Sequence, residues 1–86
     1  MKVRIPTPLR SYTAGEANVT AAGATVRELL ADIDRQFPGI TFRVVDEQGR
    51  LRQHMVVFLG QDRCRALDTS LDGIDEVVLM QALSVG

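Results

Sequence analysis

The sequence predicts an α+β domain in which one main helix packs across one face of a mixed sheet of four to five strands. Three observations support this prediction. Only residues 25–37 carry apolar side chains at helical spacing. The segments before and after them are short alternating or β-branched runs, separated by turns rich in Gly and Asp. The length of 86 residues suits one domain with a modest core.

The N-terminal part predicts a β-hairpin. Residues 2–5 alternate polar and apolar side chains, as in a half-buried strand. Pro6 and Pro8 then remove backbone donors, so pairing is limited there. After a turn at residues 14–16, residues 17–20 can return as the second strand, and the small residues that follow form a connector.

The helix is predicted from both its ends and its apolar stripe. Thr25 and Glu28 have the spacing of a capping box, in which a hydroxyl and a carboxylate satisfy the first backbone donors. Pro38 and Gly39 end the helix after about three turns. The stripe expected to face the core consists of Val26, Leu29, Leu30, Ile33 and Phe37.

The C-terminal half predicts two buried strands. Residues 40–45 alternate weakly and are expected to form a short strand or an extended crossing, before a turn at residues 46–49. Residues 54–59 are apolar on both faces, as in a central strand, and residues 77–80 form the final strand. Residues 81–86 show neither a helix nor a strand pattern. We therefore predict a domain of residues 1–80 followed by a flexible tail of residues 81–86.

This order of elements predicts the topology. A hairpin followed by a right-handed crossover helix places the last strand beside the first and parallel to it. The result is a β-grasp, or ubiquitin-like, arrangement. A ferredoxin-like fold would need a second helix, and no other segment has a helical period.

Composition excludes several classes of function. Ten Lys and Arg against eleven Asp and Glu give a net charge of −1, which argues against a nucleic-acid partner. The longest apolar run, residues 55–60, is far shorter than the roughly 20 residues that span a bilayer. A single cysteine and an N-terminus without a signal-peptide pattern lead us to expect a cytoplasmic protein. One cysteine and one histidine also exclude a Cys/His zinc site.

Few residues suggest catalysis. Cys64 lies between Arg63 and Arg65, so it is either a reactive thiolate, in a small enzyme, or a half-exposed thiol in a loop. No base stands beside it in the sequence. His54 is expected at a strand edge. Four arginines, at positions 50, 52, 63 and 65, form either a protein-docking patch or plain surface; the acidic residues Asp72, Asp75 and Glu76 suit a solvated turn better than a metal site.

The end of the chain carries a further hypothesis. Extended, residues 81–86 reach about 20 Å. Gly86 lacks a Cβ atom, so its carboxylate can enter a narrow channel and approach a reactive centre. The tail is therefore either an ordinary chain end or the reacting group itself.

Six stretches carry a resemblance that covers nearly the whole chain: LRSYT (9–13) with Gly15, GATVRELL (23–30), FPG (37–39), DEQGRLR (46–52), VVFLG (56–60) and DEV (75–77). In their order and spacing they resemble the ubiquitin-like sulfur-carrier family, MoaD/ThiS. Residues 46–52 are most similar to the branch that serves amino-acid or secondary-metabolite sulfur transfer.

The resemblance implies a protein co-substrate and not an enzyme. A ubiquitin-activating-type adenylyltransferase would use ATP to adenylate the Gly86 carboxylate, and a persulfide or sulfide would then displace AMP to leave a thiocarboxylate. The carrier would deliver this sulfur to a biosynthetic enzyme, for molybdopterin, thiazole, cysteine or a thio-metabolite. It would bind no permanent cofactor and no metal. Arg10 and Met80 are the expected docking residues, with Leu83, Ser84 and Val85 in the tail.

One departure from the family opens an alternative. The family ends in Gly-Gly, whereas this chain has Val85 before Gly86. A β-branched side chain in a narrow channel would slow activation, block it or require an adapted partner. The alternative is therefore a carrier-like binding module or subunit that forms no thiocarboxylate.

Overall fold

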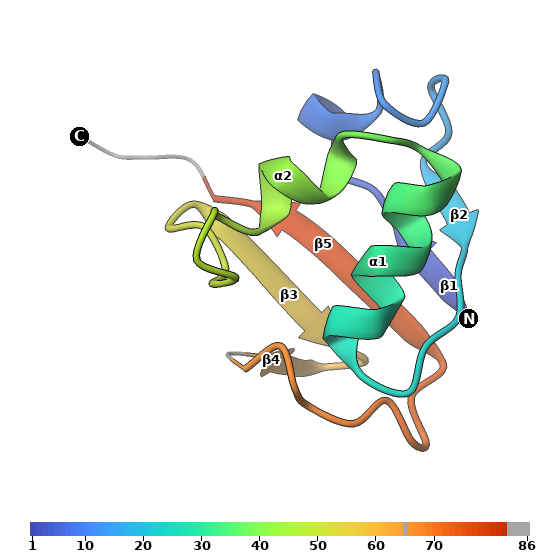
Figure 1. Cartoon of the computed structure of the whole chain (residues 1–86). Coiled ribbons are helices and arrows are strands. Elements are labelled where there is room, and N and C mark those ends of the chain that lie inside the picture. The colour runs from blue at the N-terminus through green and yellow to red at the C-terminus, as the bar shows by residue number, and fades with distance from the viewer. Residues whose placement is uncertain (65, 83–86) are drawn as a thin grey trace.

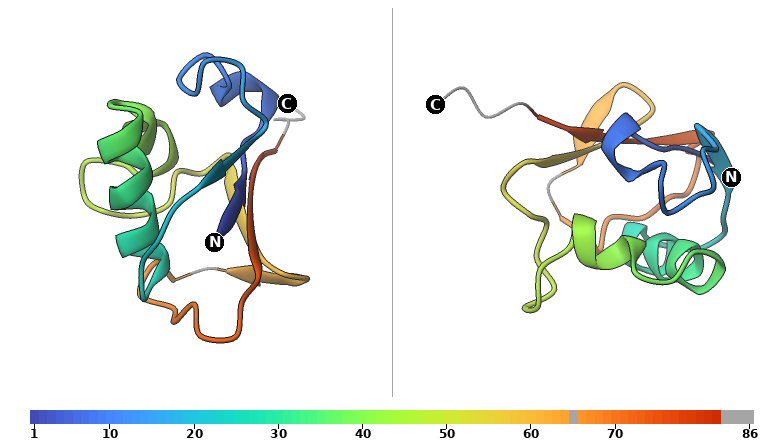
Figure 2. Two further views of the ribbon diagram at one scale, coloured as in Figure 1. Left: turned by 90° about the vertical axis from the view of Figure 1, so that its right-hand side faces the viewer. Right: turned by 90° about the horizontal axis from the view of Figure 1, so that it is seen from above.

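The computed structural model describes residues 1–64 and 66–82. In chain order the elements are β1 (Lys2–Arg4), the 3-10 helix η1 (Thr7–Leu9), β2 (Asn18–Thr20), α1 (Val26–Gln36), α2 (Ile40–Val44), β3 (Met55–Leu59), β4 (Asp62–Cys64) and β5 (Glu76–Gln81). The strands form one mixed sheet in the order β2-β1-β5-β3-β4. Both helices lie on the same side of this sheet, with α1 running across it (Figures 1 and 2). The predicted β-grasp architecture is confirmed.

The topology follows the predicted crossover. β1 pairs antiparallel with β2 and parallel with β5, so the first and last strands are neighbours at the centre of the sheet. Pro6 and Pro8 lie beyond β1, where the chain turns into η1, and they do not interrupt its pairing. β3 lies between β5 and β4, as expected for a strand that is apolar on both faces.

Helix α1 begins and ends where its sequence signals predict. The Thr25 hydroxyl accepts a hydrogen bond from the backbone N–H of Glu28 at 3.3 Å. The Glu28 carboxylate accepts from Ala24 N–H at 3.0 Å, one residue before the position that a capping box uses. Of the predicted stripe, the first four residues are buried, and Phe37 is half-buried just beyond the helix.

Residues 40–44 form a short helix, α2, and the expected strand or extended crossing is wrong. Gly39 adopts a positive φ of 98° and reverses the chain after α1. The Asp34 carboxylate then accepts hydrogen bonds from the N–H groups of Gly39 and Thr41, at 3.1 and 3.2 Å. Ile40 and Val44 are buried one turn apart, so the helical period is present but spans a single repeat.

Two strand boundaries also differ from the prediction. Cys64 was expected in a loop, but Asp62–Cys64 forms strand β4, with Gly60 at a φ of 63° in the hairpin. β5 spans Glu76–Gln81, so it extends the predicted strand of residues 77–80 by one residue at each end. In the part of the chain that the structure describes, no helix has the length and apolar character needed to cross a bilayer.

Candidate functional site

The face of the sheet opposite α1 carries an apolar patch. Strand alternation turns Val77 and Leu79 into the core and leaves Val78 and Met80 on the other face of β5. On the neighbouring strand, Val56 pairs with Met80 and Phe58 pairs with Val78. We call these four residues, Val56, Phe58, Val78 and Met80, the open-face patch.

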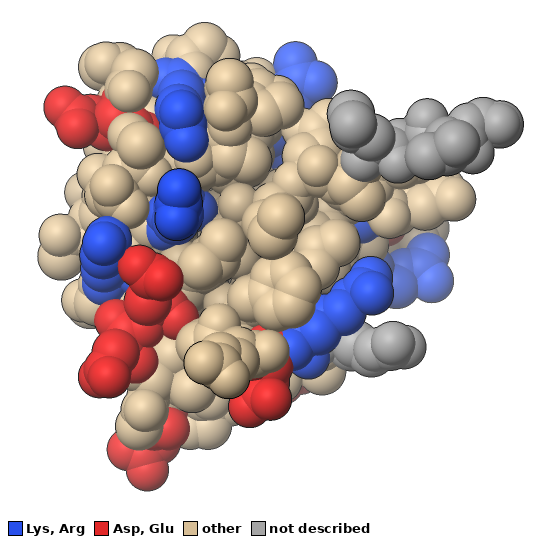
Figure 3. Space-filling model, turned by 180° about the vertical axis from the view of Figure 1, so that it is seen from behind, with Lys and Arg blue, Asp and Glu red and all other residues tan. Residues whose placement is uncertain are grey.

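Charged side chains border the open-face patch. Arg4 of β1 lies opposite Val78, and Arg63 of β4 lies opposite Phe58. Figure 3 shows this face with an uncharged centre, basic side chains around it and most of the acidic side chains toward the lower left. An apolar centre with a charged rim is the composition of a protein-docking surface.

The two docking residues predicted from the sequence, Arg10 and Met80, are brought together. Both line a groove of about 470 Å³ between β5 and the η1 segment. The Arg10 Nε atom donates a hydrogen bond to the carbonyl of Ile5 at 3.1 Å, which fixes the guanidinium beside the sheet. Met80 is 47% exposed. The residues of the open-face patch on β3 were missed, although residues 54–59 are apolar on both faces and one of these faces must lie away from α1.

The start of the tail is held by the sheet. Gln81 is the last residue of β5, and the backbone N–H of Ala82 donates to the carbonyl of His54 at 2.7 Å. The predicted tail residues Leu83, Ser84 and Val85 and the predicted reacting residue Gly86 lie outside the described residues. The body of the domain thus presents the tail from a defined point, next to the open-face patch.

A second groove lies at the same end of the molecule, between η1 and α2. It has a volume of about 600 Å³, and its lining includes Tyr12, Phe42, Arg43, Arg52 and Gln81. Phe42 is 55% exposed. Within the described residues, Phe42 and Met80 are the large apolar side chains left exposed, and each lines a groove that Gln81 also lines. Sequence reasoning missed Phe42 because it did not predict α2.

The residues considered for catalysis do not assemble a site. Cys64 is only 6% exposed, and its Sγ atom donates to the carbonyl of Ala66 at 3.1 Å. The prediction of a half-exposed loop thiol is wrong, because Cys64 lies in β4 and packs into the core. His54 is exposed just before β3. A buried thiol is poorly placed to act as a nucleophile.

The acidic and basic clusters are also divided. Asp72 and Asp75 are exposed, whereas Glu76 begins β5 and pairs with Lys2 at 3.4 Å. Across residues 1–64 and 66–82, no three His, Cys, Asp or Glu side chains are arranged to hold a metal ion. Of the four arginines considered as one patch, those at 50 and 52 follow the turn after α2, Arg63 lies on β4, and Arg65 is outside the described residues.

Comparison with known proteins gives the family. The model of the ThiS family matches residues 3–86. The sulfur carrier protein CysO of Mycobacterium tuberculosis is 29% identical over 89 residues, which cover 98% of this chain and 96% of that protein.

Solved structures agree with this match. The crystal structure of Mycobacterium tuberculosis CysO has a TM-score of 0.88 at 28% identity, covering 95% of this chain and 98% of that one. A chain in the BexX/CysO complex of Amycolatopsis orientalis has a TM-score of 0.88 at 32% identity, covering 99% and 98%. The crystal structure of SAMP1 from Haloferax volcanii has a TM-score of 0.77 at 27% identity, covering 100% of this chain and 98% of that one. Fold, sequence and family model agree, and the chain belongs to the ThiS family.

Proposed function

We propose that this chain is a sulfur carrier, a protein co-substrate whose Gly86 carboxylate is adenylated by a ubiquitin-activating-type adenylyltransferase and then converted to a thiocarboxylate. The family match and the relatives named as sulfur carriers support the proposal. The structural observation that carries it is the placement of Met80 and Phe42. These exposed apolar side chains flank Gln81, where the tail begins, so a partner that receives the tail finds an anchor on each side.

The chemistry explains why a partner is needed. A carboxylate is a poor electrophile, so its oxygen first attacks the α-phosphorus of ATP and releases pyrophosphate. Hydrosulfide then attacks the acyl carbon, and AMP leaves with its electron pair. When the donor is a persulfide, the first product is an acyl disulfide, and a second thiol must reduce it. The carrier supplies the carboxylate and the docking surface, while the adenylyltransferase uses the ATP.

The tail length suits this division of labour. Beyond Ala82, the four residues 83–86 can span at most about 14 Å. The partner therefore has to contact the domain close to Gln81 if the Gly86 carboxylate is to reach the bound nucleotide. This requirement favours the surfaces around the end of β5 over the far end of the sheet, where the acidic residues gather.

The proposed acceptor is a biosynthetic enzyme for a cofactor, cysteine or a thio-metabolite. The resemblance of residues 46–52 favours the amino-acid and secondary-metabolite branch. One of the similar structures is a BexX/CysO complex, which supports the expectation that a carrier of this type docks on a partner protein.

One observation favours a second candidate function. Val85 stands where the family has glycine, and its branched side chain would have to pass through the same channel as Gly86. A chain that docks but cannot be activated would act as a binding module or subunit. The two candidates predict the same docking surface and differ only in whether a thiocarboxylate forms.

Intact mass spectrometry separates the two candidates. After incubation with the adenylyltransferase, ATP, Mg²⁺ and sulfide, we expect a mass gain that corresponds to the exchange of one oxygen for sulfur. Oxidation of any of the three methionines adds nearly the same mass, so the gain must depend on ATP and must be absent when Gly86 is deleted. Binding to the enzyme without any ATP-dependent gain would favour the binding module.

A further inference from the structure

The groove between η1 and α2 is not explained by the open-face patch. It lies on the other side of Gln81, and we call its lining residues Tyr12, Phe42, Arg43, Arg52, His54 and Gln81 the α2 groove. Its lining combines an exposed aromatic ring with two guanidinium groups, and among the residues that the structure describes it contains no Asp or Glu. The chain as a whole has a net charge of −1, so this composition is a local departure from the average.

Neutral partners hold both guanidinium groups of the α2 groove in place. The Arg43 Nε atom donates to the Tyr12 hydroxyl at 2.7 Å, and its guanidinium carbon lies 5.9 Å from the ring centroid. The Arg52 Nε atom donates to the carbonyl of Phe42 at 2.6 Å, and its guanidinium lies 4.7 Å from the Phe42 ring. These contacts use the Nε atoms, so the terminal nitrogens keep their capacity to donate.

Within residues 1–64 and 66–82, carboxylates form ion pairs with Lys2, Arg27, Arg35 and Arg50. Arg43 and Arg52 form none, and neither do Arg4, Arg10 and Arg63. Arg43 and Arg52 differ from these three because they line one groove together with an exposed aromatic ring.

Two carboxylates lie near Arg52, because Asp46 and Glu47 line a separate depression that Arg52 also borders. The Asp46 carboxylate accepts hydrogen bonds from the N–H groups of Arg50 and Gln48, both at 2.9 Å, and the first of these is the main cause that lowers the pKa of Asp46 below its usual value. The charge of Arg52 also lowers the pKa of Asp46, but by less than these hydrogen bonds and the charge of Arg50 do. The Asp46 carboxylate is held mainly by its own turn, so the Arg52 guanidinium can still bind a carboxylate of a partner.

We propose that the α2 groove is a second docking site, which takes an acidic segment of the adenylyltransferase, with an apolar side chain on Phe42 and carboxylates on Arg43 and Arg52. The inference rests on the proposed function, because a partner that receives the tail must pass Gln81, which lines this groove and the one beside Met80. Carboxylates match the planar guanidinium donors, and an exposed aromatic ring beside them suits an anchor residue. The α2 groove and the groove beside Met80 both include Gln81, so a partner could contact the domain on either side of that residue.

The test measures the dissociation constant for the adenylyltransferase at low and high salt. The double variant Arg43→Gln with Arg52→Gln removes both charges and keeps similar side-chain size. We expect it to bind about tenfold more weakly at low salt and to lose most of the salt dependence. The matched control, Arg27→Gln with Arg35→Gln, changes the net charge equally on α1 and should bind as the wild type does. Met80→Asp should also weaken binding, through the open-face patch.

The outcomes separate this inference from the proposed function. If the wild type forms the thiocarboxylate but the Arg43/Arg52 variant binds with unchanged affinity, the α2 groove is not a docking site and the sulfur-carrier proposal stands. Equal weakening by the control pair would show that only net charge matters, and would also overturn the inference. If the variant fails to fold, amide chemical shifts of the wild type decide: on binding, those of Phe42, Arg43 and Arg52 should change, and unchanged shifts would contradict the proposal.

Discussion

At the scale of single residues, the connector before α1 shows how a small side chain can be required by packing. A Cβ atom on Gly23 would lie 2.5 Å from the backbone nitrogen of Leu29 and 2.8 Å from the carbonyl carbon of Glu28. Backbone atoms of a helix cannot move aside singly. The sequence predicted only a small, loose connector here. The close contact of Gly23 with the backbone of Glu28 and Leu29 arises from the folded arrangement and cannot be recognised in the connector sequence.

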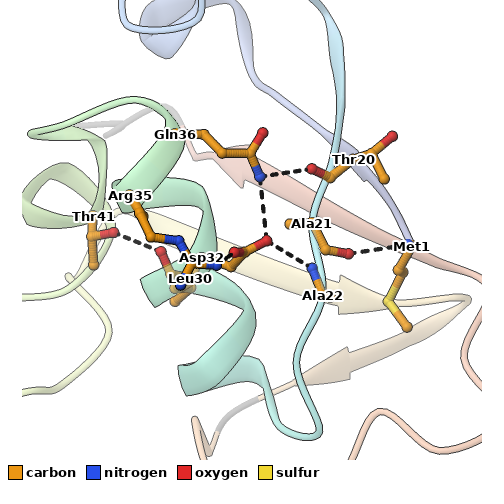
Figure 4. A network of polar contacts seen from close by, with 9 residues as sticks. All are labelled: Met1, Thr20, Ala21, Ala22, Leu30, Asp32, Arg35, Gln36 and Thr41. Atoms are coloured by element: carbon orange, nitrogen blue, oxygen red, sulfur yellow. Dashed lines mark hydrogen bonds and ion pairs between the residues drawn. The ribbon is translucent and has the colours of Figure 1, made fainter.

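Polar contacts hold the same connector from the other side. Figure 4 shows the Asp32 carboxylate accepting hydrogen bonds from Ala22 N–H and the Gln36 side chain, at 3.0 and 3.2 Å. Gln36 also donates to the carbonyl of Thr20 at 2.9 Å. The connector therefore lies against α1 with little freedom to shift and accommodate a larger residue 23.

We expect Gly23→Ala to destabilise the domain by about 1–3 kcal/mol, because the added methyl group overlaps the first turn of α1. The control is Ala22→Ser, which adds one atom at the exposed neighbouring position and should change the stability by less than about 0.5 kcal/mol. Denaturant unfolding of both variants gives the comparison. Equal midpoints for Gly23→Ala and the wild type would show that the connector and α1 lie farther apart than described.

At the scale of elements, length decided what the sequence could predict. α1 repeats its apolar period over three turns and has a cap at its start and a proline after its end, so its bounds were predicted closely. α2 contains a single buried repeat, Ile40 and Val44, which a weakly alternating strand also explains. β4 has three residues, of which only Cys64 is buried, so its sequence shows no alternation of polar and apolar side chains. Short elements are specified by partners elsewhere in the chain.

For α2 the partner that specifies it is Asp34, and removing its carboxylate should loosen the helix. We expect Asp34→Ala to cost about 1 kcal/mol, as the loss of a capping group does. Hydrogen exchange at the amide of Thr41 should accelerate at the same time, because that N–H loses its acceptor. Asp34→Asn keeps an acceptor oxygen and should retain most of the protection. Unchanged exchange in Asp34→Ala would indicate that Gly39 and the burial of Ile40 suffice to form α2.

At the scale of the whole molecule, the sequence predicted the parallel pairing of the first and last strands and a helix across one face of the sheet. Of the surfaces around the end of β5, only Arg10 and Met80 were expected, through the family resemblance. Val56 and Met80 are neighbours only through the register of β3 and β5, and Phe42 comes near Gln81 only because α2 folds over that end of the sheet (Figure 1). Cross-strand register and the packing of a short helix depend on the assembled structure.

In the proposed function the domain and residues 83–86 have separate roles. If the domain docks and the tail alone enters the active site of the adenylyltransferase, changes in the tail should affect chemistry but not stability. Deletion of Gly86 should abolish ATP–pyrophosphate exchange, because the carboxylate then falls one residue short of the nucleotide, while the unfolding midpoint stays unchanged. Val85→Gly should accelerate exchange, because glycine lets the backbone approach closely.

Val85→Ala is the matched control for this prediction, since it removes the branch at Cβ but keeps the backbone preferences of an ordinary residue. A graded order of rates, glycine above alanine above valine, would show that side-chain bulk hinders entry to the channel. Equal rates for all three would show that the channel of the partner accommodates the Val85 side chain, and the chain would then be a working carrier. If no variant exchanges pyrophosphate although each binds the enzyme, the Gly86 carboxylate is not a substrate and the binding-module function replaces sulfur carriage.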